Sequence, residues 1–205
     1  MPKIKLTKNE LKKQRDALKM FERYLPTLQL KKLQLQTEIR SVEAKALELD
    51  AAREVLLAEI RAWIAVFGEE EETRGPDGTS LISVARIHTG LGNIAGVEIP
   101  VFEGAEFSIQ DYDLFTKPLW IDKALDRIRA RLLLDLEILV LREQIVRLAS
   151  ELRITTQRVN LFEKVKIPET QENIRKIRIS LGDQQTAQVV RGKIAKRKVV
   201  ERSAA

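Results

Sequence analysis

The sequence predicts an all-α fold, a long antiparallel two-helix coiled coil with a short insert between the helices that contains a β-hairpin. Apolar residues recur every seven positions in the first third of the chain, and a second such pattern occupies the C-terminal part. A glycine-rich middle segment offers a place for the chain to reverse direction. In water, an apolar stripe on a helix must be covered by a partner helix. The C-terminal apolar pattern offers such a partner within the same chain. The predicted segments are residues 1–67, 68–117 and 118–205.

The N-terminal helix has a start signal and a continuous apolar row. Thr7 is followed three residues later by Glu10, the spacing of a capping box. Gly68 and the acidic residues 69–72 end the pattern. The predicted coiled-coil seam of this helix consists of residues spaced by seven: Phe21, Leu28, Leu35, Val42, Leu49, Leu56 and Trp63.

Three residues interrupt the regular pattern of this helix. Pro26 removes one helical hydrogen bond and predicts a kink, but the heptad phase continues through it and favours one bent helix over two separate helices. Lys32 and Arg53 occupy seam positions. Each is expected either to extend its charge out of the seam or to face an acid on the partner helix.

The middle segment contains seven of the nine glycines and two short runs rich in Val and Ile. These runs, Leu81–His88 and Ile94–Phe102, predict a β-hairpin with its turn near Gly90-Leu91-Gly92-Asn93. About 50 residues are too few for a large separate core, so a small bulb at one end of the helices is expected.

The C-terminal helix is predicted to begin near Pro118, with Thr116 as a possible cap. Near Pro168 the apolar rows resume one residue out of phase, at Ile167, Ile174 and Leu181, which predicts an irregular coil there. The predicted seam of this helix comprises Ile138, Leu141, Ile145, Leu148, Leu152, Val159 and Phe162.

Charge is concentrated at the two ends of the chain. Residues 1–19 and 189–205 each carry a net charge of +5, although the whole chain carries only +6. In an antiparallel hairpin these ends meet, so an acidic partner at that tip is one interpretation and two solvated ends are the other. There are no cysteines, no secretory signal at residues 1–6 and no apolar run of the roughly 20 residues that a membrane helix needs.

The sequence offers no catalytic constellation. The only histidine, His88, lies in a predicted strand, and with no cysteine the usual metal-ligand spacings are absent. Gly90, Gly92 and Gly96 do not match a dinucleotide loop, and Gly75-Pro76-Asp77-Gly78 lacks the ending of a P-loop. We therefore expect no cofactor, no metal and no enzymatic activity. A basic coiled-coil scaffold or a nucleic-acid-associated coiled coil is the alternative that the composition allows.

The stretch Thr155–Pro168, TTQRVNLFEKVKIP, resembles the R-V-N-x-x-E…I-P signature of the D subunit of V-type (vacuolar/archaeal-type) ATP synthases and ATPases. The late stretch Arg191-Gly192-Lys193-Ile194 and the order helix, short β insert, longer helix extend the resemblance over the full length. Pro26 departs from what the family leads one to expect in the first helix. The residues that match the signature are Arg158, Asn160, Glu163, Ile167 and Pro168.

This resemblance implies a non-catalytic rotor axle, the central stalk, that enters a ring of catalytic and regulatory subunits, A and B, and turns on the cytoplasmic side of the membrane. It also implies contacts with the small F subunit of the stalk and with the C subunit, the adaptor of the membrane ring, with no nucleic acid bound and no direct membrane insertion. Arg158, Asn160 and Glu163 would contact the ring or the F subunit, or bond within the coil. The γ subunit of F-type enzymes is a weaker match because it has a larger domain between its helices. The residues expected to face the ring are Lys3, Lys5, Lys8, Lys12, Arg191, Lys193, Lys196 and Arg197.

Overall fold

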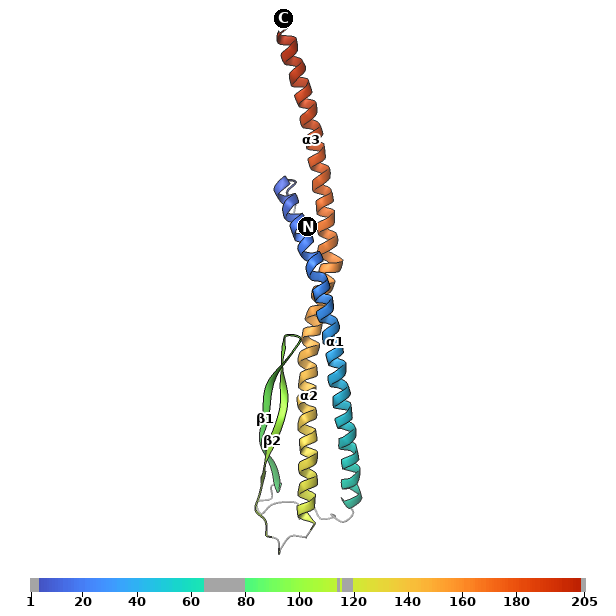
Figure 1. Cartoon of the computed structure of the whole chain (residues 1–205), viewed down its shortest axis with the longest axis vertical. Helices are drawn as coiled ribbons and strands as arrows, with labels where there is room; N and C mark the ends of the chain where they lie inside the picture. The colour runs from blue at the N-terminus through green and yellow to red at the C-terminus, as the bar shows by residue number, and fades with distance from the viewer. Residues whose placement is uncertain (1–3, 65–79, 114, 116–119, 204–205) are drawn as a thin grey trace. The chain divides into compact units, whose positions relative to one another are not determined.

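The computed structural model describes residues 4–64, 80–113, 115 and 120–203 of the 205-residue chain. Helix α1 spans Lys8–Ile64, strands β1 and β2 span Ile82–Ile94 and Val97–Ile109, and helix α2 spans Ile121–Leu161 (Figure 1). A π-helix, η2, covers Phe162–Lys166 and leads directly into helix α3, Ile167–Ser203. The predicted fold class is confirmed: two long helical segments with a small antiparallel β-hairpin between them.

The chain divides into two compact units. The terminal unit contains Met1–Lys32 and Ile154–Ala205, and the hairpin unit contains Leu33–Arg153. Both α1 and α2 contribute residues to each unit. Each unit is therefore built from one stretch of each long helical segment, and each has its own buried residues.

The beginning of α1 follows the predicted capping pattern. The backbone N–H of Glu10 donates to Oγ1 of Thr7 at 3.3 Å, and the N–H of Leu11 donates to the Thr7 carbonyl at 3.0 Å. The helix then continues through Pro26 without interruption. The predicted end of this helix at residue 67 and the predicted start of the next one near Pro118 lie outside the described residues.

Apolar side chains of α1, α2 and the β-hairpin form the main core of the hairpin unit. In this core Leu35 and Leu148 are completely buried, and Ile99 of β2 packs with them. The remaining buried members are Ile39, Val42, Ala46 and Leu141. A second cluster, Leu81, Ile82, Ile121 and Leu125, joins the base of the hairpin to the first turns of α2. Burial of each Leu or Ile contributes about 1.5–3 kcal/mol, so these clusters hold the hairpin against the helices.

The hairpin turn lies four residues beyond the centre of the predicted turn, so the predicted strand ends and turn are wrong. The strands are joined by Ala95 and Gly96, with φ of 52° and 78°, the left-handed values that a tight hairpin turn requires. Oδ1 of Asn93 accepts a hydrogen bond from the Gly96 N–H at 3.0 Å. Gly90 and Gly92 are instead strand residues opposite Val101 and Ile99. A Cβ on Gly92 would lie 2.7 Å from Cγ2 of Val101, so this glycine makes room for a cross-strand side chain.

Changing Ala95 to Asn is expected to stabilise the hairpin unit by about 0.5–1 kcal/mol, because Asn-Gly suits a turn with two positive φ angles better than Ala-Gly. Ala95 is the one described non-glycine residue with positive φ. The measurement is the free energy of unfolding in urea, with Ala85→Asn, at an exposed position in β1, as the matched control. An Ala95→Asn variant no more stable than the wild type would show that strand packing alone determines the turn.

The slip of the apolar rows near Pro168 coincides with the π-helix. In η2 the N–H of Ile167 donates to the carbonyl of Phe162, one residue further back than in an α-helix. This insertion of one residue returns the downstream apolar positions to the same face as Val159. Ile174 and Ile177 of α3 are accordingly buried in the terminal unit.

Candidate interaction surfaces

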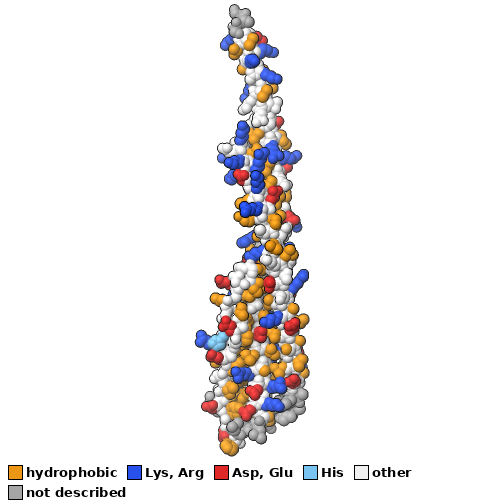
Figure 2. Space-filling view, in the orientation of Figure 1, with side chains coloured by type: hydrophobic (Ala, Val, Ile, Leu, Met, Phe, Trp, Pro, Cys, Tyr) orange, Lys and Arg blue, Asp and Glu red, His pale blue; other side chains and the backbone are white. Residues whose placement is uncertain are grey.

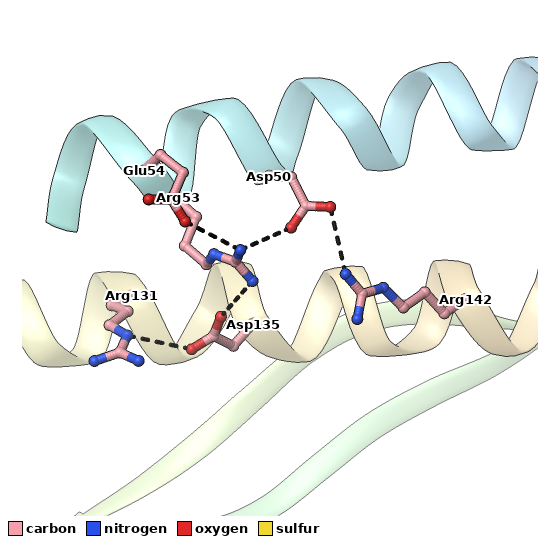
Figure 3. A network of polar contacts seen from close by, with 6 residues as sticks. All are labelled: Asp50, Arg53, Glu54, Arg131, Asp135 and Arg142. Atoms are coloured by element: carbon pink, nitrogen blue, oxygen red, sulfur yellow. Dashed lines mark hydrogen bonds and ion pairs between the residues drawn. The ribbon is translucent and has the colours of Figure 1, made fainter.

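A network of charged side chains joins α1 to α2 inside the hairpin unit (Figure 3). Nη2 of Arg53 lies 3.1 Å from Oδ1 of Asp50 on the same helix, and Nη1 lies 3.6 Å from Oδ1 of Asp135 on α2. Oδ2 of Asp50 lies 3.4 Å from Nη2 of Arg142, which returns the network to α2. The side chains of Asp50, Arg53 and Asp135 are 26–33% exposed, so water only partly screens these charges.

Arg53 remains positively charged in this setting. A hydrogen bond of 3.2 Å to Glu54 raises the pKa of its guanidinium, and the nearby charges of Asp50 and Asp135 raise it further, although desolvation lowers it. Of the two alternatives expected for Arg53, the second, an acid on the partner helix, is the one observed, because Arg53 contacts Asp135. Lys32, the other charged seam position, is half-buried in the terminal unit.

Two further ion pairs connect the same two helices. Nζ of Lys45 lies 3.5 Å from Oε1 of Glu137, and Oε2 of Glu59 lies 2.9 Å from Nη1 of Arg127. These pairs are more exposed than the pairs around Arg53, and exposed pairs contribute at most about 1 kcal/mol each. They nevertheless identify which residues of α1 lie opposite which residues of α2, that is, the register of the two helices.

The predicted seam residues differ in burial. The buried ones are Leu35, Val42, Ile138, Leu141, Leu148 and Val159. The half-buried ones are Phe21, Leu28, Leu49, Leu56, Ile145, Leu152 and Phe162. The side chain of Trp63 lies outside the described part of the structure. In the terminal unit the rings of Phe21 and Phe162 pack with their centroids 5.1 Å apart, a pairing that the heptad pattern alone does not specify.

The signature residues lie around the π-helix. Arg158 and Asn160 belong to the last turn of α2, Glu163 lies in η2, and Ile167 and Pro168 begin α3. The side chains of Arg158, Asn160 and Glu163 are exposed. Within the residues that the structure describes, these three side chains form no hydrogen bond or ion pair. This geometry does not support bonding within the coil, one of the two roles expected for them.

The basic residues of the two chain ends are exposed on the terminal unit. Lys8 and Lys12 lie in the first turns of α1, Lys5 precedes the helix, and every residue from 188 to 202 of α3 is exposed. This stretch of α3 includes Arg191, Lys193, Lys196 and Arg197. On the face drawn in Figure 2, Lys and Arg side chains crowd the surface of this unit. Lys3 lies outside the described residues.

The described residues contain neither a group of side chains placed to bind a metal ion nor a helix suited to span a membrane. His88 pairs with Glu106 across the hairpin at 2.9 Å, on the surface of β1 and β2. Among the described residues, no group of three or more His, Cys, Asp or Glu side chains is placed to hold a metal ion. None of the helices in the described part of the chain combines the length and apolarity needed to cross a bilayer.

Sequence reasoning missed the contact that attaches the hairpin to α2. Gln144 is buried, and its Nε2 donates to the backbone carbonyl of Pro100 in β2 at 2.5 Å. The one available signal is a glutamine placed between Leu141 and Leu148, on the side of the helix that carries the apolar seam. A buried amide needs a partner, but the sequence does not identify a backbone carbonyl in another element.

The fold and these surfaces define an antiparallel coiled-coil protein with a β-hairpin insert and a strongly basic terminal unit. The model of the family described as the D subunit of ATP synthase matches residues 10–197, and the chain belongs to this family. The family predicted from the signature is thereby confirmed.

Curated relatives agree with this assignment over nearly their whole length. The V-type ATP synthase D subunit of Borreliella burgdorferi is 48% identical over 203 residues, which is 99% of this chain and 98% of the relative. The protein of the same name from Chlamydia trachomatis serovar L2 is 34% identical over 196 residues, 96% of each chain. The one from Chlamydia felis is 34% identical over 199 residues, 97% of this chain and 95% of the relative. These relationships agree with the predicted role of a central stalk subunit of a rotary ATPase.

Proposed function

We propose that this chain is the axle of a V-type ATP synthase, present in one copy and turning inside a ring of catalytic and regulatory subunits, A and B. It transmits torque between ATP chemistry in that ring and ion movement in the membrane sector, and it carries out neither reaction itself. It works as a peripheral component on the cytoplasmic side. The small F subunit binds along the coiled coil, and the C subunit, the membrane-ring adaptor, binds the insert.

The observation that carries this proposal is the opposite charge of the two units. The terminal unit contains 22 Lys and Arg against 8 Asp and Glu, whereas the hairpin unit contains 14 against 22. A net charge of +14 on the terminal unit and −8 on the hairpin unit gives them different preferred partners. The terminal unit suits an acidic surface, so it is the unit that enters the ring. Lys5, Lys8, Lys12 and the basic residues of 191–197 are its ring-facing side chains.

The paired helices suit the mechanical role. Two helices locked by buried side chains such as Leu35 and Leu148 resist bending and twisting better than one helix, because any bend must also disturb the packing between them. A stiff axle that presents different sides to the ring in turn favours a different conformation at each catalytic interface, through differential contacts.

Two other surfaces supply the remaining contacts. Arg158, Asn160 and Glu163 project from the coil without partners in the described structure, which supports a contact with the F subunit or the rim of the ring. In the insert, the Phe115 side chain is 99% exposed, and aromatic residues are enriched at protein–protein interfaces. We assign it to the contact with the C subunit.

Co-expression with the A, B and F subunits is expected to give a complex that contains one copy of this chain and hydrolyses ATP, whereas the purified chain alone does not. The measurements are native mass spectrometry and ATPase assays. Charge reversal at Lys8, Lys12, Arg191 and Lys193 should weaken assembly at least tenfold, because four attractive contacts become repulsive.

The control reverses exposed charges of the hairpin unit, Arg40→Glu with Arg61→Glu, and should leave assembly within about twofold of the wild type, as surface charges outside an interface do. Several copies per complex, or no binding to the ring, would disprove the axle. Tight binding of duplex DNA by the isolated chain, lost in the terminal-unit variant, would favour the alternative of a nucleic-acid-associated coiled coil.

A further inference from the structure

We propose that the charged network around Arg53 fixes the axial register of α1 against α2, so that the two helices cannot slide past each other by one heptad. The network would act within this chain, whether or not a partner subunit is bound. The residues involved are Asp50, Arg53, Asp135 and Arg142, supported by Lys45–Glu137 and Glu59–Arg127.

The apolar seam alone leaves the register open. Leu35, Val42, Leu49 and Leu56 recur every seven residues on α1, and Leu134, Leu141 and Leu148 do the same on α2. A shift of seven residues therefore places apolar residues opposite apolar residues again. Coiled coils with such repeats commonly use a polar residue in the seam to select one register.

The ion pairs distinguish the observed register from its two neighbours. Arg53 faces Asp135 and Asp50 faces Arg142 across the seam, at 3.6 and 3.4 Å. If α2 slides by seven residues in one direction, Arg53 meets Arg142 and Asp50 meets Ala149. If it slides in the other direction, Asp50 meets Asp135 and Arg53 meets Ile128.

Each neighbouring register thus brings two like charges together. The pairs Lys45–Glu137 and Glu59–Arg127 are also lost in both shifted registers. Lys45 would face Gln144 or Ala130, and Glu59 would face Leu134 or Trp120. Among the described residues, the four ion pairs that join α1 to α2 exist only in the observed register.

The burial of the network is consistent with a role in specificity more than in stability. Oδ1 of Asp50 and Nε of Arg53 are buried and form no hydrogen bond within the described structure, although Oδ1 of Asp50 lies within ion-pair distance, 3.1 Å, of Nη2 of Arg53. Such imperfectly satisfied charges stabilise a fold less than apolar residues of similar size, but they discriminate strongly against like-charge arrangements. The partial burial of these groups also makes like-charge contacts more costly than they are at an exposed surface.

Disulfide formation between introduced cysteines reports the register, because the chain has no cysteine of its own. In the full chain, Lys45→Cys with Glu137→Cys and Glu59→Cys with Arg127→Cys report the observed register. Lys45→Cys with Ala130→Cys reports a shift in one direction, and Glu59→Cys with Leu134→Cys reports a shift in the other. With the network intact, the observed-register disulfides should exceed the shifted ones at least tenfold under mild oxidation.

The decisive variant removes the network by Asp50→Ala, Arg53→Leu, Asp135→Ala and Arg142→Ala. The shifted disulfides should then rise to within about threefold of the observed-register ones, while helix content by circular dichroism is retained. The matched control is Glu143→Ala with Arg147→Ala, which removes an ion pair within α2 and should leave the disulfide pattern unchanged.

A single substitution tests the same idea by gain of function. In Arg53→Asp, residue 53 repels Asp135 in the observed register and attracts Arg142 in the shifted one, so the disulfide between positions 59 and 134 should become the major product. If Arg53→Asp and the network-free variant both form only the observed-register disulfides, apolar packing and the hairpin set the register and the proposal is wrong.

Discussion

Replacing Leu148 by alanine is expected to lower the free energy of unfolding by about 2–5 kcal/mol. Leu148 is completely buried and packs in the cluster that joins α2 to α1 and to Ile99 of the hairpin. Truncation removes apolar contacts with all three elements and leaves a cavity that the surrounding helices cannot close without losing their own packing. Urea unfolding followed by circular dichroism at 222 nm measures the change.

The control for this prediction lies on the same helix. Leu139 is 61% exposed, so Leu139→Ala removes the same atoms from a surface position and should cost less than about 1 kcal/mol. Equal losses for the two variants would mean that helix propensity, not the buried cluster, determines the stability of this part of the chain.

Deleting Lys164 is expected to leave the terminal unit folded, with its free energy of unfolding changed by no more than about 1 kcal/mol, whereas deleting Gln157 should cost several kcal/mol. Lys164 lies in η2, where the helix contains one residue more than a regular heptad pattern allows. Removing it converts the π-helix to α-helix and keeps Ile174 and Ile177 on the buried face.

Gln157 is an equally exposed helix residue but lies in a regular stretch. Its deletion rotates every later residue by about 100° relative to Thr155, which turns Val159 and Phe162 away from the seam. Each buried apolar side chain lost in this way costs about 1.5–3 kcal/mol. Thermal unfolding of both variants measures the difference, and comparable losses would show that η2 has a role beyond accommodating the additional residue.

Much of this fold is predictable because heptad spacing reports helix pairing directly. The seam from Phe21 through Leu56, the Thr7 cap and the slip before Pro168 all follow from side-chain spacing or local backbone chemistry. The position of the hairpin turn does not follow from local sequence. Gly90-Leu91-Gly92-Asn93 has the composition of a turn, but Gly92 is needed where the Val101 side chain crosses the partner strand, and that contact is not local in the sequence.

The candidate surfaces were predictable only in part, because they too depend on contacts between residues that are distant in the sequence. The sequence identified Arg53 as a charge in the seam but not its partner, because a repeat of seven leaves several alignments of the two helices equally good. Asp135 becomes its partner only once the register is known. The charges of the terminal unit were visible as two separate basic ends, yet their sum appears only when the fold brings residues 1–32 and 154–205 together.

The hydrogen bond from Gln144 to Pro100 also bears on aggregation. A two-stranded sheet has two open edges, and open edges are where chains pair into unwanted assemblies. In β2, Pro100 has no N–H to offer an incoming strand, and its carbonyl is already occupied by the amide of Gln144. At this position β2 cannot be extended by a strand from a second copy, so the Gln144–Pro100 bond also protects this edge against aggregation.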